Sequence, residues 1–236
     1  MKTIIHTSAS RGYADHAWLK SWHTFSFADY FDRSRMNFGV LRVLNDDIVG
    51  KDNGFGMHPH QNMEILTVVL KGAISHSDSY GNEGIIHPDE VQVMSAGTGI
   101  YHSEMNKSQN EDCHLLQLWF LPAQQNLKPR YEQHRVDKEQ RQDKIHTFVS
   151  PFGQGGILSL HQEVWVSRLD ATEGKSFTYQ MHDKNNGLYI FVIEGSIKTA
   201  GITLNRRDAA GITESSKADI KALKNSEIIM FEVKMI

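Results

Sequence analysis

The sequence has only one cysteine, Cys113, among its 236 residues. A single thiol cannot form a disulfide within the chain, which fits a reducing compartment, so we expect a cytoplasmic protein. No run of about 18 apolar residues is present, and no membrane-spanning helix is expected. The opening segment MKTIIHTSASRG lacks the apolar stretch of about 7–15 residues that a secretory signal needs, so no signal peptide is expected.

A strong excess of charge is also absent. Lys and Arg number 25 and Asp and Glu number 28, which gives a formal charge of −3. A mildly acidic chain has no general attraction for phosphates, so we expect no direct nucleic-acid partner. Hydrophobic residues make up 39% and charged residues 22%, as in ordinary soluble globular proteins. The length allows one large domain or two of about 100–120 residues.

Long helical patterns are scarce, and the apolar segments are short. They are rich in Val, Ile, Leu and Phe, end at Gly, Asn or Asp, and recur roughly every 8–12 residues, which predicts a β-sandwich or barrel. The predicted strand segments are Val40–Leu44, Glu64–Leu70, Gly72–Ser77, Val91–Met94, Leu115–Leu121, Gly156–Leu160, Leu188–Ile193 and Ile228–Val233. The polar stretch Val136–Lys144 is expected to be a linker or a surface helical turn.

A faint internal repeat indicates two similar halves. Leu70–Ile74 (LKGAI) resembles Ile193–Ile197 (IEGSI), and each follows an apolar run. The offset between the two segments is 195 − 72 = 123 residues. The boundary between the halves is expected within residues 122–148.

Histidine is the abundant residue, with 13 copies. In the segment GMHPH, His58 and His60 are two residues apart, so both side chains leave the same face of an extended strand. Pro59 favours that extended backbone and removes a hydrogen-bond donor, which is typical of an edge strand. A His-x-His is nevertheless expected roughly 0.7 times by chance in this composition. Glu64 continues the same alternation.

A second segment, Ser95–Glu104 (SAGTGIYHSE), places His102 and Glu104 on one face of a strand after a glycine-rich turn. Similar spacings occur by chance, and His76 with Asp78 is interpreted as part of an ordinary polar face. Three imidazoles and one carboxylate suit a divalent first-row metal ion. Among these ions we expect Fe(II), with Mn, Co, Ni, Cu and Zn left open. Four protein ligands on an octahedral ion leave two positions for O2, water or substrate.

These motifs resemble the two metal-binding motifs of the cupin superfamily, and more narrowly the pirin family. The resemblance is carried by Ser21–Phe31 (SWHTFSFADYF), Phe55–Gly72 (FGMHPHQNMEILTVVLKG), Met94–Met105 (MSAGTGIYHSEM) and Asp112–Phe120 (DCHLLQLWF). It is dense over residues 10–135 and loose after 145. The chain departs from the general cupin pattern at Asp52, where cupins have Gly, and at Gly97, where many have Pro.

The resemblance implies an all-β bicupin, two tandem jelly-roll barrels with few short helices. It implies a metal-binding cupin over residues 1–130, a linker region over 131–148 and a degenerate cupin over 149–236. In the pirin family the carboxylate ligand corresponds to Glu104, whereas in archetypal cupins it corresponds to Glu64. The resemblance therefore favours one metal ion per chain, held by His58, His60, His102 and Glu104.

The second half lacks these ligands. Adding the offset of 123 to His58, His60 and Glu64 gives Met181, Asp183 and Gly187. His182 is one residue out of register, and a shift of one residue turns a side chain to the other face of a strand. We therefore expect no metal in the C-terminal half.

The resemblance implies a dioxygenase that cleaves flavonols with O2, of the quercetin 2,3-dioxygenase type. Glu104 or Glu64 is the expected proton acceptor, and Gln117 is expected to line the substrate cavity. The expected partners are a small aromatic, flavonol-like substrate and O2, and the chain is expected to be a monomer. Two alternatives stay open: an iron-containing regulatory or redox-sensing protein that binds a protein partner, and a cupin that holds metal and ligand without turnover.

Two further residues have ordinary interpretations. His23 is expected to pack the N-terminal arm across a barrel rather than to do chemistry. Cys113 is expected to be a plain residue at a strand end, with a redox-sensing thiol as the alternative if its pKa is lowered.

Overall fold

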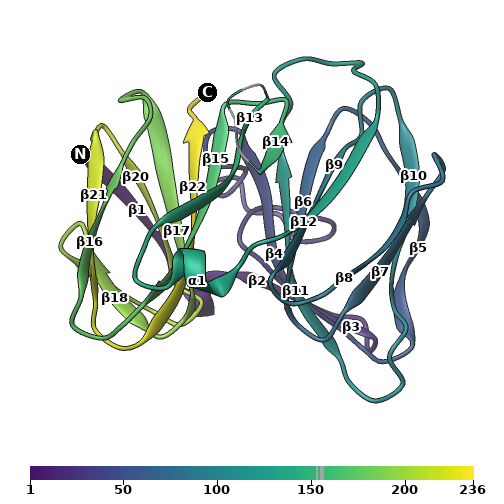
Figure 1. Cartoon of the computed structure of the whole chain (residues 1–236), viewed down its shortest axis with the longest axis horizontal. Helices are drawn as coiled ribbons and strands as arrows, with labels where there is room; N and C mark the ends of the chain where they lie inside the picture. The colour runs from purple at the N-terminus through teal and green to yellow at the C-terminus, as the bar shows by residue number, and fades with distance from the viewer. Residues whose placement is uncertain (153, 155–156) are drawn as a thin grey trace.

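A computed structural model describes residues 1–152, 154 and 157–236 of the chain. In this part of the chain almost all regular structure is β-strand, with one 3-10 turn at Ser8–Ser10 and one short helix, α1, at Lys138–Arg141. The strands form two barrels that lie side by side (Figure 1). The predicted all-β, two-barrel architecture is confirmed. No helix in the described ranges is long and apolar enough to cross a membrane.

The N-terminal barrel consists of a seven-stranded sheet facing a four-stranded sheet. The larger sheet has the order β12-β9-β6-β11-β4-β3-β2, with strands Arg130–Arg135, Glu90–Ser95, Glu64–Lys71, Cys113–Phe120, Leu41–Val49, Leu19–His23 and Gly12–Asp15. The smaller sheet has the order β5-β10-β7-β8, with strands Asn53–His60, Ile100–Asn106, Ile74–Asp78 and Glu83–Ile86.

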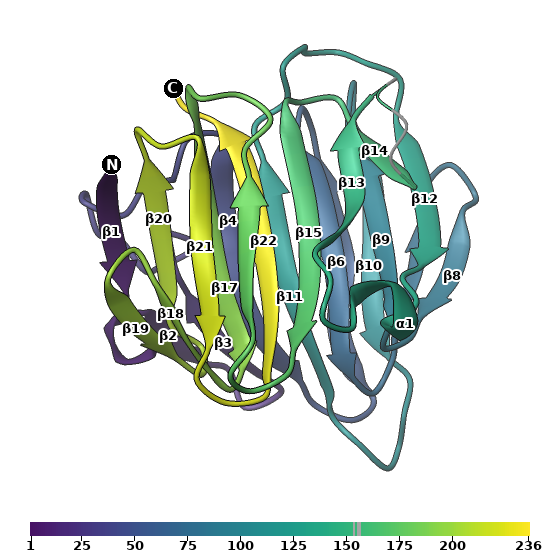
Figure 2. The same cartoon turned by 60° about the vertical axis from the view of Figure 1, so that its left-hand side comes forward.

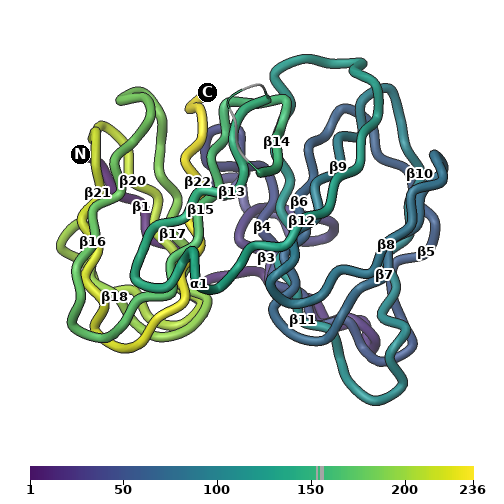
Figure 3. Tube along the Cα trace, viewed as in Figure 1, coloured from purple at the N-terminus to yellow at the C-terminus, as the bar shows by residue number. Residues whose placement is uncertain are grey.

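The C-terminal barrel repeats this arrangement. Its seven-stranded sheet has the order β1-β20-β17-β22-β15-β13-β14, with strands Lys2–His6, Ala209–Thr213, Asn186–Glu194, Ser226–Lys234, Val164–Ala171, His146–Pro151 and Leu158–Leu160. Its four-stranded sheet has the order β16-β21-β18-β19, with strands Ser176–Gln180, Lys217–Ala222, Ser196–Thr199 and Ile202–Asn205. Apart from the purple β1, the C-terminal barrel is green to yellow in the chain trace and the N-terminal barrel is purple to teal (Figure 3).

The repeat seen in the sequence corresponds to an equivalent turn in each barrel. Gly72 joins β6 to β7, and Gly195 joins β17 to β18. Both have positive φ, +75° and +91°, a conformation that side-chain-bearing residues rarely adopt. The glycines are therefore required by the turn, which explains why this short pattern is shared by both halves.

The first strand of the chain belongs to the sheet of the C-terminal barrel. β1 pairs with β20 in an antiparallel register, with Lys2 opposite Thr213 (Figure 2). The chain then crosses to the N-terminal barrel at β2. The proposed division at residues 1–130, 131–148 and 149–236 remains a prediction about domain units. The polar stretch 136–144 contains α1, as expected.

The two seven-stranded sheets pack against each other and share one apolar core. Along β11, Leu116, Leu118 and Phe120 point into this core, and Phe120 meets Phe231 of β22 at a ring distance of 6.3 Å. The alternate residues of β11 point into the N-terminal barrel, because successive side chains of a strand face opposite ways. One face of the seven-stranded sheet therefore packs against the other barrel, and the opposite face lines the interior of the N-terminal barrel.

Most of the predicted strand segments lie in observed strands. The segments at residues 64–70, 91–94, 188–193 and 228–233 fall within β6, β9, β17 and β22, and those at 40–44 and 115–121 overlap β4 and β11 apart from one end residue each. The segment at 72–77 begins with the Gly72 turn and enters β7 at Ile74. The last predicted segment to compare covers residues 156–160. Its final three residues form β14, and Gly156 itself lies outside the described residues.

Candidate metal centre

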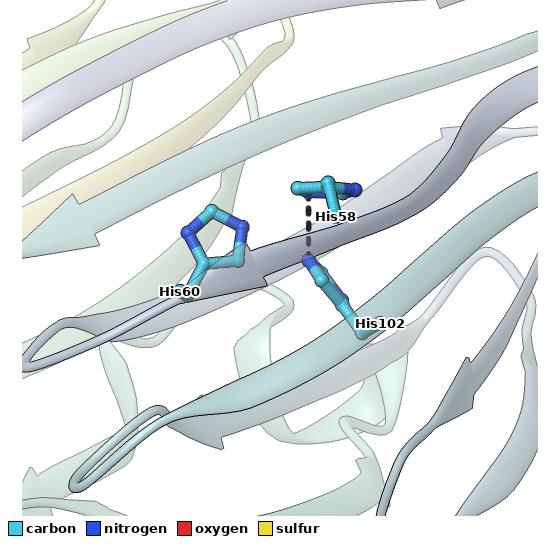
Figure 4. A group of neighbouring side chains, drawn as sticks. All are labelled: His58, His60 and His102. Carbon is cyan, nitrogen blue, oxygen red and sulfur yellow. Dashed lines mark hydrogen bonds between the residues drawn. The ribbon is translucent and has the colours of Figure 1, made fainter.

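Three histidine side chains meet inside the N-terminal barrel, on its four-stranded sheet. His58 and His60 are two residues apart on β5, and His102 lies opposite His58 on β10. Their ring centroids are 4.4 to 4.8 Å apart. Figure 4 shows the three rings turned toward one another from the two neighbouring strands. One nitrogen of each ring lies within 4.8 Å of the others, a spacing that a single metal ion can bridge.

The three imidazoles are held in a form that suits metal binding. Burial lowers the pKa of His60 to about 4 and the pKa of His102 to about 2, with the neighbouring histidines adding to the effect. Both rings are therefore neutral at neutral pH and keep a lone pair on one nitrogen. Nδ1 of His58 lies 2.8 Å from the carbonyl oxygen of Gly56, which only accepts, so Nδ1 carries the proton and Nε2 is free to bind.

Glu104 follows on β10 and is almost completely buried. A register shift in the β5–β10 pair lies between His102 and Glu104. One carboxyl oxygen accepts a hydrogen bond from Thr67 at 3.1 Å, and the other accepts one from Gln117 at 2.7 Å. Burial raises the pKa of Glu104 to about 7. The carboxyl group is therefore fixed in position and able to exchange a proton near neutral pH.

His76 also belongs to this centre, which the sequence analysis missed. The β7–β10 register places His76 opposite Glu104. Nδ1 of His76 lies 3.5 Å from Nδ1 of His102, so His76, His102 and Glu104 form a second ligand-type group that shares His102 with the first. His76 is buried and hydrogen-bonded to Asp78, which fits the expected polar pair, but its position beside His102 and Glu104 was not expected. No spacing in the sequence shows the pairing of β7 with β10.

The hydrogen bonds around His102 test whether a cation fits here. Nε2 of His76 donates to Asp78 at 3.3 Å, so Nδ1 of His76 accepts, as does Nε2 of His58. A neutral His102 lies between these two acceptors but carries only one N–H. A cation held by His58 and His102 would remove the mismatch, because the remaining N–H of His102 could then donate to His76. The donor set fits a metal ion.

A cavity of about 250 Å³ opens beside the three imidazoles. Its lining combines apolar and aromatic side chains with a few polar groups, as is usual for small-molecule sites. The lining residues are Leu19, Ser21, Phe27, Asn45, Asp47, Phe55, His58, His60, Glu104, Gln117 and Trp119. Trp119 packs edge-on against His60 at 4.8 Å and against Phe27 at 5.2 Å. Gln117 and Glu104 both line this cavity, from the two facing sheets, and are hydrogen-bonded to each other across it.

Strand alternation produces the polar layer of this cavity. On β11, Gln117 lies between Leu115 and Trp119 on the inward face, and on β6 Thr67 lies between Ile65 and Val69. The apolar neighbours form two small clusters, one toward each end of the barrel. The polar side chains are thereby confined to the middle of the barrel, next to the histidines.

Glu64 lies apart from this arrangement. Its buried carboxylate accepts hydrogen bonds from the hydroxyl of Ser95 at 2.8 Å and from the backbone N–H of His161 at 3.1 Å. Glu64 is in neither ligand-type group and not in the described lining of the cavity. It contacts the junction with the C-terminal barrel through His161.

Cys113 and His23 have the ordinary roles that were expected. Cys113 begins β11 and is fully buried, and burial raises the pKa of its thiol to about 12. A protonated, inaccessible thiol is a poor redox sensor. His23 is buried at the end of β3, where Nδ1 donates to Asn45 at 2.9 Å and the ring stacks near Tyr30.

The C-terminal barrel has a filled interior at the corresponding place. In its equivalent strand pair, Tyr179 of β16 lies opposite Ala218 of β21, and Phe177 lies opposite Ile220. The side chain of His182 contacts Glu232 and Trp165: its Nδ1 lies 2.7 Å from Glu232, and its ring stacks on Trp165. Among the described residues, both ligand-type groups lie in the N-terminal barrel. A larger hollow of about 420 Å³ beside β18 and β21 has no histidine or cysteine in its lining, so volume alone does not identify the site.

Two tandem β-barrels, one of them with inward-facing histidines, define a two-domain protein of the cupin type. Family models match both halves: "Pirin" matches residues 5–120, and "Quercetinase C-terminal cupin domain" matches residues 147–233. The chain is 40% identical over 229 residues to "Quercetin 2,3-dioxygenase" of Escherichia coli K12, covering 97% of each chain. It is 38% identical over 222 residues to "Pirin-like protein" of Caulobacter vibrioides, covering 94% of this chain and 95% of that one.

A solved structure shows the same fold. The bacterial pirin YhhW of Escherichia coli in complex with nickel(II) superposes with a TM-score of 0.94 at 37% identity, covering 100% of both chains. The protein therefore belongs to the pirin family.

Proposed function

We propose that this chain is a metal-dependent dioxygenase that cleaves flavonols with O2, of the quercetin 2,3-dioxygenase type. One observation carries the proposal: three imidazoles and a buried carboxyl group meet beside an aromatic-lined cavity. The name of the Escherichia coli relative supports this substrate class.

One divalent metal ion per chain is proposed, bound by His58, His60, His102 and Glu104. The geometry supports the three histidines as one group and Glu104 as a neighbour of His102. Fe(II) is the ion we propose first, because imidazole and carboxylate ligands with open positions suit it. The same donors also suit Mn, Co, Ni, Cu and Zn, and the YhhW structure was obtained with nickel(II).

The residues of the cavity have different roles in the proposed reaction. A bound divalent ion supplies positive charge that stabilises the flavonol after its hydroxyl beside the carbonyl has lost a proton. We assign Glu104 as the acceptor of that proton, because its carboxyl group lines the cavity beside His58 and His60. Thr67 and Gln117 hold the Glu104 carboxyl in place. Glu64, the other expected acceptor, lacks access to the described cavity, so we assign this role to Glu104.

The apolar walls position the substrate. Phe27, Phe55 and Trp119 offer flat faces and edges to a planar ring system and exclude water from the reacting atoms. Both atoms of O2 enter the opened product, and one carbon of the central ring leaves as carbon monoxide. The cavity is smaller than most drug-sized sites, which measure about 300–1,000 Å³, so a flavonol would fill it and extend to its mouth.

The proposal is tested with full-length protein loaded separately with Fe(II), Mn(II), Co(II), Ni(II) or Cu(II). Loss of the quercetin absorption band, O2 consumption and carbon monoxide release are measured together. We expect turnover with at least one metal, and a loss of at least about 100-fold in kcat/KM for His58→Ala and for Glu104→Ala. His87→Ala, at an exposed histidine outside the site, is the matched control and should keep full activity.

The outcomes separate the proposal from its alternatives. Turnover that survives loss of His58 and Glu104 would contradict the assigned site. Tight metal binding without turnover of any flavonol would contradict the enzyme and favour a binding or regulatory protein. In that case, a partner retained only by metal-loaded protein would identify the regulatory alternative.

A further inference from the structure

Two neighbouring aspartates of β4 face opposite sides of the large sheet. Asp46 points to the junction between the barrels, where its carboxylate lies 3.2 Å from Arg11, 2.6 Å from His114 and 3.5 Å from Arg207. Asp47 points the other way and lines the cavity beside the histidines. The alternation of a β-strand produces this difference. Asp46 is fully paired, whereas no cation lies within ion-pair distance of Asp47 among the described residues.

Asp47 has one unused carboxyl oxygen. Its residue is 3% exposed, and its Oδ1 accepts a hydrogen bond from the hydroxyl of Ser21. No partner for Oδ2 is present among the described residues, yet Oδ2 is not sealed in the protein interior. Both oxygens of Glu104, the other carboxyl group of the cavity, are hydrogen-bonded. Asp47 therefore offers an acceptor oxygen to a donor that enters the cavity, and a substrate that excludes water without supplying a donor would leave that oxygen unpaired.

Hydrogen bonds among His23, Asn45 and Ser21 fix the orientation of the Asp47 carboxyl group. His23 donates its Nδ1 proton to Asn45 at 2.9 Å and lies 3.2 Å from the Ser21 hydroxyl. Because the Ser21 oxygen faces an N–H of His23, its own proton is directed to Asp47. Burial also raises the pKa of Asp47 to about 7, with Asp46 and Glu104 adding to the effect. Either protonation state of the carboxyl group can bond to a hydroxyl.

Asp47 and the candidate metal ligands lie on facing sheets. β4 belongs to the seven-stranded sheet, and β5 and β10 belong to the four-stranded sheet across the barrel (Figure 1). A molecule held at one edge by the metal centre therefore presents its other polar groups toward β4. The other polar side chains that the large sheet contributes to this lining are Ser21, Asn45 and Gln117, and each is already hydrogen-bonded within the protein, to Asp47, His23 and Glu104.

We propose that Asp47 binds a hydroxyl group of the substrate, distinct from the hydroxyl that meets the metal centre. The inference rests on the proposed function and extends it to substrate selection. The chain would prefer flavonols that carry a further free hydroxyl over flavonols that lack it or carry it as a methyl ether. The physical reason is that an ether offers no proton to Oδ2 and leaves the buried carboxyl unpaired.

The test is a binding measurement that does not depend on turnover. Full-length protein loaded with nickel(II) is kept anaerobic, and Kd is measured by calorimetry for quercetin and for 3-hydroxyflavone, which keeps only the hydroxyl beside the carbonyl. For Asp47→Leu we expect quercetin to bind about ten- to a hundredfold more weakly, while 3-hydroxyflavone changes less than about threefold. Asp47→Asn keeps the shape and hydrogen-bonding capacity and should show a smaller loss for quercetin.

Controls separate binding from folding. Ser21→Ala frees the Asp47 carboxyl and should weaken quercetin binding severalfold, whereas Ser167→Ala, at a buried serine of the C-terminal barrel, should change neither ligand. Nickel content and Tm are measured for every variant. Should Asp47→Leu fail to fold, Asp47→Asn provides the same comparison between the two ligands.

Results of two kinds would overturn the inference in distinguishable ways. Unchanged quercetin binding would mean that Asp47 meets only water, and equal losses for both ligands would mean that Asp47 acts on the site both share; either result overturns the inference while the proposed function stands. A nickel-loaded wild type that binds neither flavonol would overturn the proposed function and, with it, the inference.

Discussion

At the scale of single residues, the ability of the candidate metal centre to bind a cation depends on which ring nitrogen of each histidine carries the proton. Gly56 holds the proton of His58 on Nδ1, and Asp78 holds that of His76 on Nε2. His102 lies between the two and is the residue whose hydrogen bonds a cation completes. Partners of this kind orient a metal-binding histidine and raise its basicity, so they affect metal affinity without touching the ion.

We predict that His76→Phe weakens nickel(II) binding about 10- to 100-fold, because His102 loses the acceptor that fixes its tautomer. The affinity is measured by competition with a chelator of known strength. His87→Phe, at an exposed position, is the matched control and should bind nickel like the wild type. Unchanged affinity would contradict the positioning role, and complete loss of binding would make His76 a ligand.

At the scale of elements, the centre requires β5 and β10 to lie unusually close where the register shifts. Met105 lies opposite Gly54, just beyond Glu104. A Cβ on Gly54 would overlap the carbonyl oxygen of Glu104 and lie 2.6 Å from Cα of Met105. Gly56, two residues along the same strand, has open space where a Cβ would be. The two glycines of this motif therefore have different roles.

Gly54→Ala should force the strands apart beside Glu104. We expect a loss of about 1–3 kcal/mol in unfolding free energy and weaker nickel(II) binding. Gly56→Ala is the matched control and should alter stability by less than about 1 kcal/mol, since nothing lies near the added methyl group. Denaturant unfolding and chelator competition measure the two effects, and equal behaviour of the variants would refute the close approach as the cause.

At the scale of the whole molecule, two similar barrels share one core but differ in what fills them. The N-terminal barrel carries a polar layer around Thr67, Gln117 and Glu104 between two small apolar clusters. The interior of the C-terminal barrel is one continuous apolar cluster that includes Tyr179, Ile190 and Met230. Among the described residues, both ligand-type groups lie in the N-terminal barrel, and a packed apolar cluster leaves no room for an ion within it.

Elemental analysis of the metal-loaded chain should therefore return about one ion per chain. Removal of the metal with a chelator should lower the Tm, because a bound ligand stabilises the unit that binds it. We expect this destabilisation to arise in the N-terminal barrel. Glu104→Ala should abolish the metal-dependent shift in Tm. Two ions per chain would contradict a metal-free C-terminal barrel, and a shift that survives the loss of Glu104 would contradict Glu104 as a ligand.

Much of this architecture could be predicted from local patterns. Short apolar runs predicted the strands, and the shared Gly72 and Gly195 patterns marked equivalent turns, because positive φ restricts the residue type. His58 and His60 could be paired in advance because strand alternation is a local rule. The role of His76 could not be predicted, since it follows from the β7–β10 register across the barrel.

The sequence by itself determined the strand pattern, the paired histidines and the absence of histidines at the equivalent positions 181 and 183, since each depends on residue types and spacings along one stretch of chain. Only the tertiary structure decided that His76 joins the centre, that Glu64 faces away from the cavity, and that Asp47 faces it while Asp46 does not. These facts depend on which strands pair across the barrel and on which side of a sheet meets the second barrel. Both are set by long-range packing, which no local spacing encodes.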